Sequence, residues 1–186
     1  MKYFPPKLWL DFSSRRKQTA RAAKRTWTSN FRSYKKSLQR ILPALSPKAR
    51  RFFLDALLLH DGTLNRMEIG DQIDRFAAPR RRSDWDRRNV RVRLFVLPRT
   101  GEFGYELEYK LVSNVQFNFP GRLSLFPAGL YPNFGDWGYD ELSLVSKALF
   151  RHEILFSSGA SISIDFQKFS VRRRSLKQPT ISKTSP

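Results

Sequence analysis

The spacing of the apolar residues changes once along the chain, and this change constrains the fold more than any other feature. Before residue 42 apolar residues recur every three or four positions, as they do on one face of an α-helix. The members of this apolar stripe are Ala20, Ala23, Trp27, Phe31, Tyr34, Leu38 and Ile41. From Thr63 onward apolar and polar residues alternate, which is the period of a β-strand. The sequence therefore predicts an α+β fold with helices first and strands afterwards.

The helical part predicts two helices. The first begins near residue 13 and ends at Pro43, because proline cannot continue a helix. The second covers residues 46–60, with Ser46 as its N-cap. Gly62 is placed to end this second helix in a left-handed conformation.

The remaining residues predict a curved antiparallel sheet of about five or six strands, on which the two helices pack. Residues 90–97 and 105–111 alternate, and the loop between them is typical of a hairpin. A second hairpin is predicted within residues 151–169, and residues 140–150 are expected to form a short helix. Pairing the first hairpin should bring its outward-facing charges together, which is a structural use of those charges. The four charged residues are Arg91, Arg93, Glu106 and Glu108.

The formal net charge of +19 is distributed unevenly. Residues 1–51 carry 15 Lys or Arg and one acid, residues 52–171 carry 15 of each sign, and residues 172–186 carry five Lys or Arg and no acid. We predict one globular unit, in which a basic helical segment (1–62) packs on an antiparallel β domain (63–171), and a disordered basic tail after it. Such an asymmetry favours an anionic partner for the two ends.

Several function classes are excluded or disfavoured by composition. The chain has no cysteine, which excludes a disulfide framework, a cysteine-ligated zinc or iron–sulfur site and a thiol nucleophile. No glycine-rich phosphate loop or G-x-S-x-G turn is present. No apolar run is long enough to span a bilayer, and the first residues lack the features of a secretory signal. We therefore expect a cytoplasmic protein without a cofactor.

Two histidine–acid pairs and two nearby acids are the candidates for catalytic or metal chemistry. They are His60, Asp61, His152, Glu153, Asp140 and Glu141. If these side chains converged, they could ligate a divalent ion or transfer protons. A structural role is the competing interpretation, since a histidine at a helix C-terminus or in a strand is commonly hydrogen bonded there. We favour the structural interpretation and assign no catalytic residue and no metal ligand.

The basic residues of the first helix gather on one flank beside the apolar stripe, and the opposite flank carries Ser, Thr and Asn. The basic ridge consists of Lys17, Arg21, Lys24, Arg25, Arg32, Lys35 and Lys36. Such a ridge can contact phosphates without reading a base sequence. Three alternatives stay open: a merely solvated flank, an organellar transit peptide, and a helix lying on an anionic membrane.

The chain resembles a family of uncharacterised bacterial proteins. The similarity rests on the opening "MKYFPPKLWL", on Trp27 and Tyr34 within one helix, on "LHDG" at residues 59–62, and on the closing "HEILFSSGASISIDF". Members open with M-[KR]-Y-F-x-P-x-L and carry H-D-[AG] before the first strand. The resemblance implies a shared fold but no activity, and it implies that His60 and Asp61 belong to the common scaffold or site. Members carry many acids in the first helix, so a nucleic-acid role would be particular to this chain.

The leading hypothesis is a non-catalytic binding module that contacts an anionic partner, with nucleic acid favoured, through the basic ridge and the tail. One alternative is a metal-dependent or acid/base enzyme built on the two histidine–acid pairs. Another is a toxin-neutralising partner protein, which would expose an aromatic patch near Trp137 and Tyr139.

Overall fold

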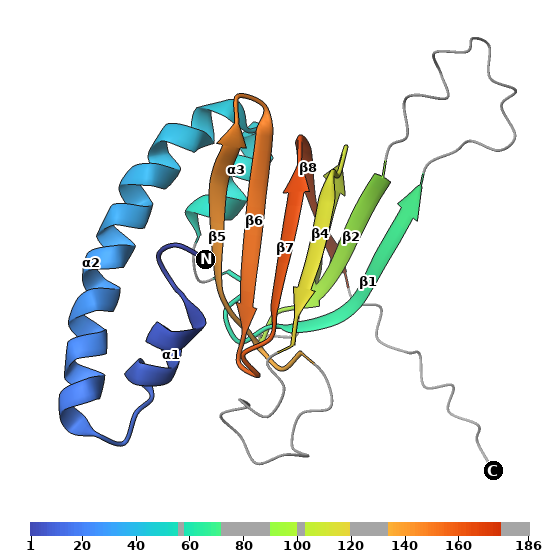
Figure 1. Ribbon diagram of the computed structural model, residues 1–186. Coiled ribbons are helices and arrows are strands. Elements are labelled where there is room, and N and C mark those ends of the chain that lie inside the picture. The colour runs from blue at the N-terminus through green and yellow to red at the C-terminus, as the bar shows by residue number, and fades with distance from the viewer. Residues whose placement is uncertain (56–57, 72–89, 100–102, 120–133, 176–186) are drawn as a thin grey trace, which may run out of the picture.

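The computed structural model describes residues 1–55, 58–71, 90–99, 103–119 and 134–175, and its helices and strands form an α+β fold (Figure 1). The helices are α1 (Pro6–Phe12), α2 (Lys17–Ile41) and α3 (Pro47–Leu54), with a 3₁₀ turn at Leu42–Ala44. The strands are β1 (Thr63–Asp71), β2 (Val90–Leu97), β3 (Phe103–Lys110), β4 (Asn114–Asn118), β5 (Trp137–Ser146), β6 (Leu149–Phe156), β7 (Ser161–Phe166) and β8 (Lys168–Ser175). The predicted order of helices before strands is confirmed.

The strands form two antiparallel sheets, so the prediction of one sheet of five or six strands is wrong. Sheet A has the order β1-β2-β3-β8 and sheet B the order β4-β7-β6-β5. The chain changes sheet after β3 and again between β7 and β8, where Gln167 alone separates the two strands. The N–H of Ser113 donates to the carbonyl of Asp165, and that of Gln167 to the carbonyl of Lys110, so these corners are tied together. Neither corner carries the glycine-rich turn that marks a hairpin in a sequence.

The second helix begins as predicted but ends early. Ser46 is its N-cap, since the Ser46 Oγ accepts from the N–H of Ala49. Gly62 is not a left-handed cap, because Asp61 is the residue with positive φ (61°). Gly62 is required for space instead: a Cβ there would lie 2.8 Å from the carbonyl oxygen of Leu59 and 3.0 Å from that of Leu97.

Residues 140–150 form the hairpin of β5 and β6, so the predicted short helix is wrong. Adjacent residues Glu141 and Leu142 are both buried, because β5 is covered on both faces and along its outer edge. This burial removes the simple alternation by which a strand is recognised. β8 also continues through Arg172–Ser175, four residues into the predicted tail, because these residues pair with β3. Residues 176–186 lie outside the described residues.

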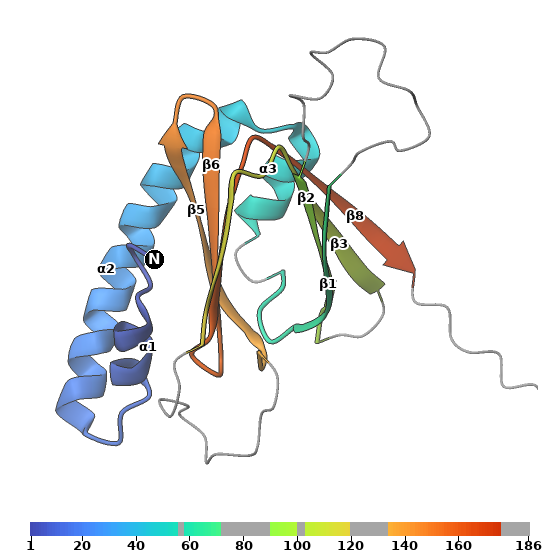
Figure 2. The ribbon, with the colours of Figure 1, turned by 45° about the vertical axis from the view of Figure 1, so that its right-hand side comes forward.

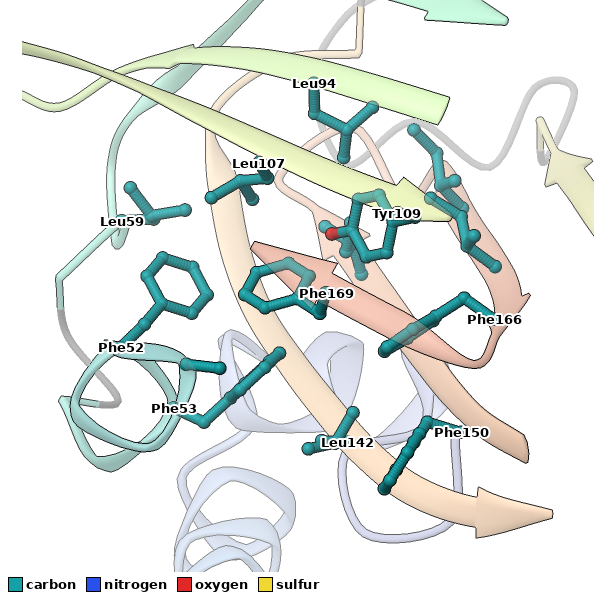
Figure 3. Packing of buried hydrophobic residues seen from close by; sticks show 14 of the residues in the cluster. Phe52, Phe53, Leu59, Leu94, Leu107, Tyr109, Leu142, Phe150, Phe166 and Phe169 are labelled. Carbon is teal, nitrogen blue, oxygen red and sulfur yellow. The ribbon is translucent and has the colours of Figure 1, made fainter. Parts of the chain in front are cut away.

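One continuous core joins the two sheets and α3. Figure 3 shows Tyr109 of β3, Phe166 of β7 and Phe169 of β8 packed beside Phe53 of α3. The ring centroid of Phe169 lies 5.0 Å from that of Phe53 and 5.1 Å from that of Tyr109. This core accounts for most of the apolar residues that alternate in β2, β3, β6 and β7.

α2 packs its apolar stripe along β5 and over the first residues of the chain (Figure 1). The Trp27 ring contacts Tyr139 of β5 at 4.3 Å between centroids and Phe4 at 4.6 Å. The buried hydroxyl of Tyr34 accepts from the N–H of Leu142 at 2.9 Å. Burial, aided by nearby acids, raises the pKa of Tyr34 well above its usual range, so the phenol stays protonated. The helix is therefore fixed to the sheet by both ring packing and one directed hydrogen bond.

We predict that Tyr34→Phe destabilises the protein by about 1–3 kcal/mol, because it leaves the buried N–H of Leu142 without an acceptor. Urea unfolding followed by tryptophan fluorescence measures this loss. Tyr105→Phe is the control, since no printed hydrogen bond involves that hydroxyl in the described part of the chain, and its effect should stay within about 0.5 kcal/mol. Equal effects of the two substitutions would contradict the role given to Tyr34.

Candidate functional site

The seven cations of the basic ridge are all exposed on the outer flank of α2. None of them forms an ion pair with any residue that the structure describes. At 1.5 Å per residue the ridge extends about 28 Å from Lys17 to Lys36. Lys24, Arg25 and Arg32 line a shallow depression together with Thr28 and Ser29. The predicted ridge residues therefore share one accessible surface.

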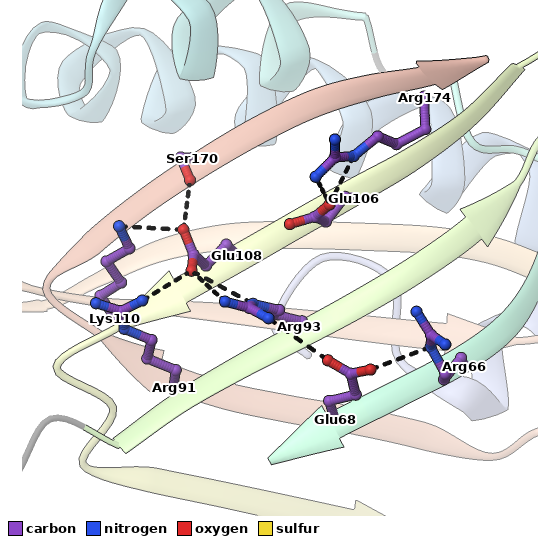
Figure 4. Close-up of polar contacts among 9 residues, drawn as sticks. All are labelled: Arg66, Glu68, Arg91, Arg93, Glu106, Glu108, Lys110, Ser170 and Arg174. Atoms are coloured by element: carbon purple, nitrogen blue, oxygen red, sulfur yellow. Dashed lines mark hydrogen bonds and ion pairs between the residues drawn. The ribbon is translucent and has the colours of Figure 1, made fainter. Parts of the chain in front are cut away.

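The cations of sheet A are placed differently, because most of them face acids on its outer surface (Figure 4). Glu108 is nearly buried and lies within 3.4 Å of both Arg91 and Arg93 and 3.1 Å from Lys110. These contacts confirm the predicted proximity of Arg91 and Arg93 to Glu108.

Two further acids complete the charge network of sheet A. Glu106 pairs across to Arg174 of β8 at 2.6 Å, rather than with β2 as predicted. Glu68 lies 3.2 Å from Arg66 and 3.7 Å from Arg93. The surface of sheet A is therefore largely neutralised within the molecule, in contrast to α2.

The basic residues at the end of β8 do not join the ridge. In Figures 1 and 2 α2 lies at the left, beside β5, whereas the end of β8 lies to the right of sheet B. Arg173 stacks on Phe103 with its guanidinium carbon 3.4 Å from the ring centroid, and Arg174 contacts Glu106. The ridge and the described part of the predicted tail thus present two separate basic surfaces.

The six candidate histidine and acid residues fall into three separate places. Asp140 and His152 meet between the two sheets, Glu141 and Glu153 lie on the opposite face of sheet B, and His60 and Asp61 form a third pair in the turn before β1. Successive side chains of a strand point to opposite faces, so neighbours in sequence are separated here. Among the described residues no group of three or more His, Asp or Glu is arranged to hold a metal ion.

Asp140, His152 and Tyr109 form a buried polar chain. His152 Nε2 lies 3.0 Å from Asp140 Oδ2, and His152 Nδ1 lies 2.7 Å from the Tyr109 hydroxyl. Burial, together with the charge of Asp140, raises the pKa of Tyr109 well above its usual range, so the phenol is a donor. A neutral imidazole with its proton on Nε2 satisfies both contacts. Both ring nitrogens are therefore occupied, which leaves neither free to ligate a metal or to act as a base.

Glu141 binds the first residues of the chain. Its Oε1 accepts from the N–H groups of Tyr3 at 2.7 Å and Phe4 at 2.6 Å, and its Oε2 accepts from that of Lys2 at 2.8 Å. Burial raises the pKa of Glu141, and these hydrogen bonds only partly offset that effect. The opposing residue Glu153 accepts from the amino group of Met1 at 2.6 Å. Both acids therefore have structural partners.

His60 is the histidine with an available nitrogen. Its Nδ1 lies 3.0 Å from Asp61 Oδ1, and Asp61 Oδ2 lies 3.2 Å from Arg99. The ring packs edge-on against Tyr139, whose pKa is raised by burial and by the charge of Asp61. An acid/base function would have to rely on His60 and Asp61 alone, since the other candidates are engaged elsewhere.

The remaining alternatives also meet the geometry. Trp137 is fully buried, and Tyr139 is half-buried among Phe4, Trp9 and Trp27, so the aromatic patch expected of a toxin-neutralising protein is not exposed at these two residues. Within the described ranges, no helix has the length and apolar character needed to cross a membrane.

Comparisons with protein-family models, curated proteins and solved structures give no match to this chain.

The structure adds partners that the sequence patterns did not indicate. Tyr34 was predicted only as a member of the apolar stripe, and Tyr109 only as an inward-facing strand residue, yet each supplies a hydroxyl to a buried polar group more than 40 residues away in sequence. A local pattern cannot reveal such contacts. The only signal available was the tyrosine itself, at an apolar position where phenylalanine would pack equally well.

We predict that Glu108→Gln reduces the acid sensitivity of the protein. Burial raises the pKa of Glu108, but Lys110, Ser170 and Arg91 outweigh it, and the net pKa is lowered. The ionised group therefore stabilises the fold above its unfolded pKa of about 4.3, and this contribution is lost as pH falls through the lower folded value. The difference in unfolding free energy between pH 7 and pH 3 should shrink in the variant. An unchanged difference in urea titrations would contradict the assignment.

We also predict that Glu141→Ala costs about 3 kcal/mol or more, because three N–H groups lose their acceptor. Glu141→Gln should lose less, since its amide oxygen can still accept from Tyr3 and Phe4. Unfolding titrations measure the free energies, and hydrogen exchange at residues 2–4 measures the local release. If the alanine variant kept wild-type protection at these amides, the anchoring role would be wrong.

Proposed function

We propose that this protein is a non-catalytic nucleic-acid-binding module, and that the basic ridge of α2 contacts the phosphate backbone. The observation that carries this proposal is the contrast between two sets of cations. Those of sheet A are largely matched by Glu68, Glu106 and Glu108, whereas those of α2 have no acid partner in the described part of the chain. An unmatched row of cations on a rigid element has phosphate as its natural counterpart.

The rigidity of the ridge supports a phosphate row as the partner. α2 is held by its stripe and by the Tyr34 hydroxyl, so the cations keep fixed positions along its axis. Little ordering of the backbone would accompany binding, which favours affinity. The side chains of the ridge carry no base-reading pattern, so we expect binding that depends on salt and not on sequence.

The docked stripe also argues against the two other uses of a basic amphipathic helix. A helix that lies on a membrane buries its apolar face in the lipid, but here Trp27, Tyr34 and Leu38 pack within the fold. A cleaved transit peptide would remove the same residues from the core. Nucleic acid requires only the exposed flank, which packing leaves available.

We predict that replacing Lys24, Arg25 and Arg32 together by Gln weakens binding to a mixed-sequence DNA duplex. Each lost phosphate contact lowers the slope of log K against log salt by about 0.9, so the triple variant should lose about 2 to 3 from the slope. Gln keeps the helix propensity. Fluorescence anisotropy at several salt concentrations measures both quantities.

The matched control replaces Lys7, Lys48 and Lys147 by Gln, which removes the same charge from exposed positions outside the ridge. This control should keep the wild-type slope. Equal losses in both variants would mean that net charge, and not the ridge, drives binding. If wild-type protein does not bind duplex DNA or RNA even at low salt, the proposed function is wrong.

A further inference from the structure

A groove between α2 and α3 is accounted for neither by the fold nor by the proposed function. Its apolar lining consists of Phe31, Tyr34, Leu38, Leu42, Phe53 and Leu54. Leu54 is 61% exposed, which is unusual for a leucine at the wall of a concave surface. The groove encloses about 550 Å³ of empty space, within the range of about 300–1,000 Å³ typical of small-molecule sites.

The polar groups at the rim give the groove a chemical preference. Lys35 and Gln39 line it one helical turn apart, and none of its eight lining residues is an acid in the described part of the chain. The ammonium of Lys35 lies 4.7 Å from the ring centroid of Phe31, so it is held over the apolar floor. A cation beside buried apolar area, with an amide donor next to it, complements an anion attached to a hydrocarbon body.

We infer that this groove binds an amphiphilic carboxylate, with its alkyl chain along the apolar lining and its carboxylate on Lys35 and Gln39. The α2 residues of the groove extend about 16 Å along the helix axis, from Phe31 to Leu42. The enclosed space is smaller than the volume of an α-helix of that length, which is about 10–12 Å across, so a single chain fits where a peptide helix does not. This inference does not depend on nucleic-acid binding.

Titration calorimetry with the full chain tests the inference, with dodecanoate below its micelle concentration as the probe. One dodecanoate per chain should bind. Dodecanol, which lacks the charge, and acetate, which lacks the chain, should each bind at least about tenfold more weakly, because either the ionic hydrogen bond or the apolar burial is missing. No saturable binding of dodecanoate, or equally tight binding of dodecanol, would overturn the proposal.

Two neighbouring lysines provide a matched pair of variants. Lys35→Gln should weaken dodecanoate binding about tenfold, whereas Lys36→Gln, which removes a ridge cation that does not line the groove, should change it less than about twofold. Leu54→Asn should also weaken binding, and Leu144→Asn, at an exposed leucine on β5, should not. Equal losses for the two lysine variants would show that overall charge is responsible and would refute the site. The lysine pair is sufficient even if Leu54→Asn fails to fold.

Discussion

β5 is the element on which the rest of the structure depends, because its polar groups bind the helical half of the chain to the sheets. The N–H of Leu142 donates to Tyr34 of α2, and the carboxylate of Glu141 accepts three N–H groups of residues 2–4. Tyr139 completes the arrangement by packing against Trp27. An edge strand usually leaves a row of unpaired backbone groups, and here an otherwise local helix covers that edge. The same contacts determine which side of α2 faces solvent.

The buried polar chain of Asp140, His152 and Tyr109 links the two sheets, since His152 belongs to β6 and Tyr109 to β3. Each donor and acceptor in the chain has a partner, which is the condition under which a buried network is tolerated in an apolar core. The arrangement explains why a histidine–acid pair in the sequence need not indicate catalysis. A base must offer a nitrogen to its substrate, and His152 offers none.

The sequence predicts the parts of the fold that have a local period. The apolar stripe of α2, the Ser46 cap and the pairing of β2 with β3 are confirmed, because each depends on residues within one or two elements. The division into two sheets could not be predicted, since it is decided at corners such as Gln167, whose partner Lys110 lies in another strand. The predicted convergence of Glu141 with Asp140 failed for a related reason: strand geometry sends adjacent residues to opposite faces.

The two halves of α2 offer different surfaces, although both carry the basic ridge. In the first half the stripe is covered by ring contacts of Trp27 with Phe4, Phe12 and Tyr139, so charge is the property left for a partner. In the second half α3 stands close enough to line a groove but not to close it, so Lys35 is exposed beside apolar surface. A single helix can thus present a phosphate-binding row and an amphiphile-binding groove. This follows because packing against β5 uses its stripe and leaves its flank free.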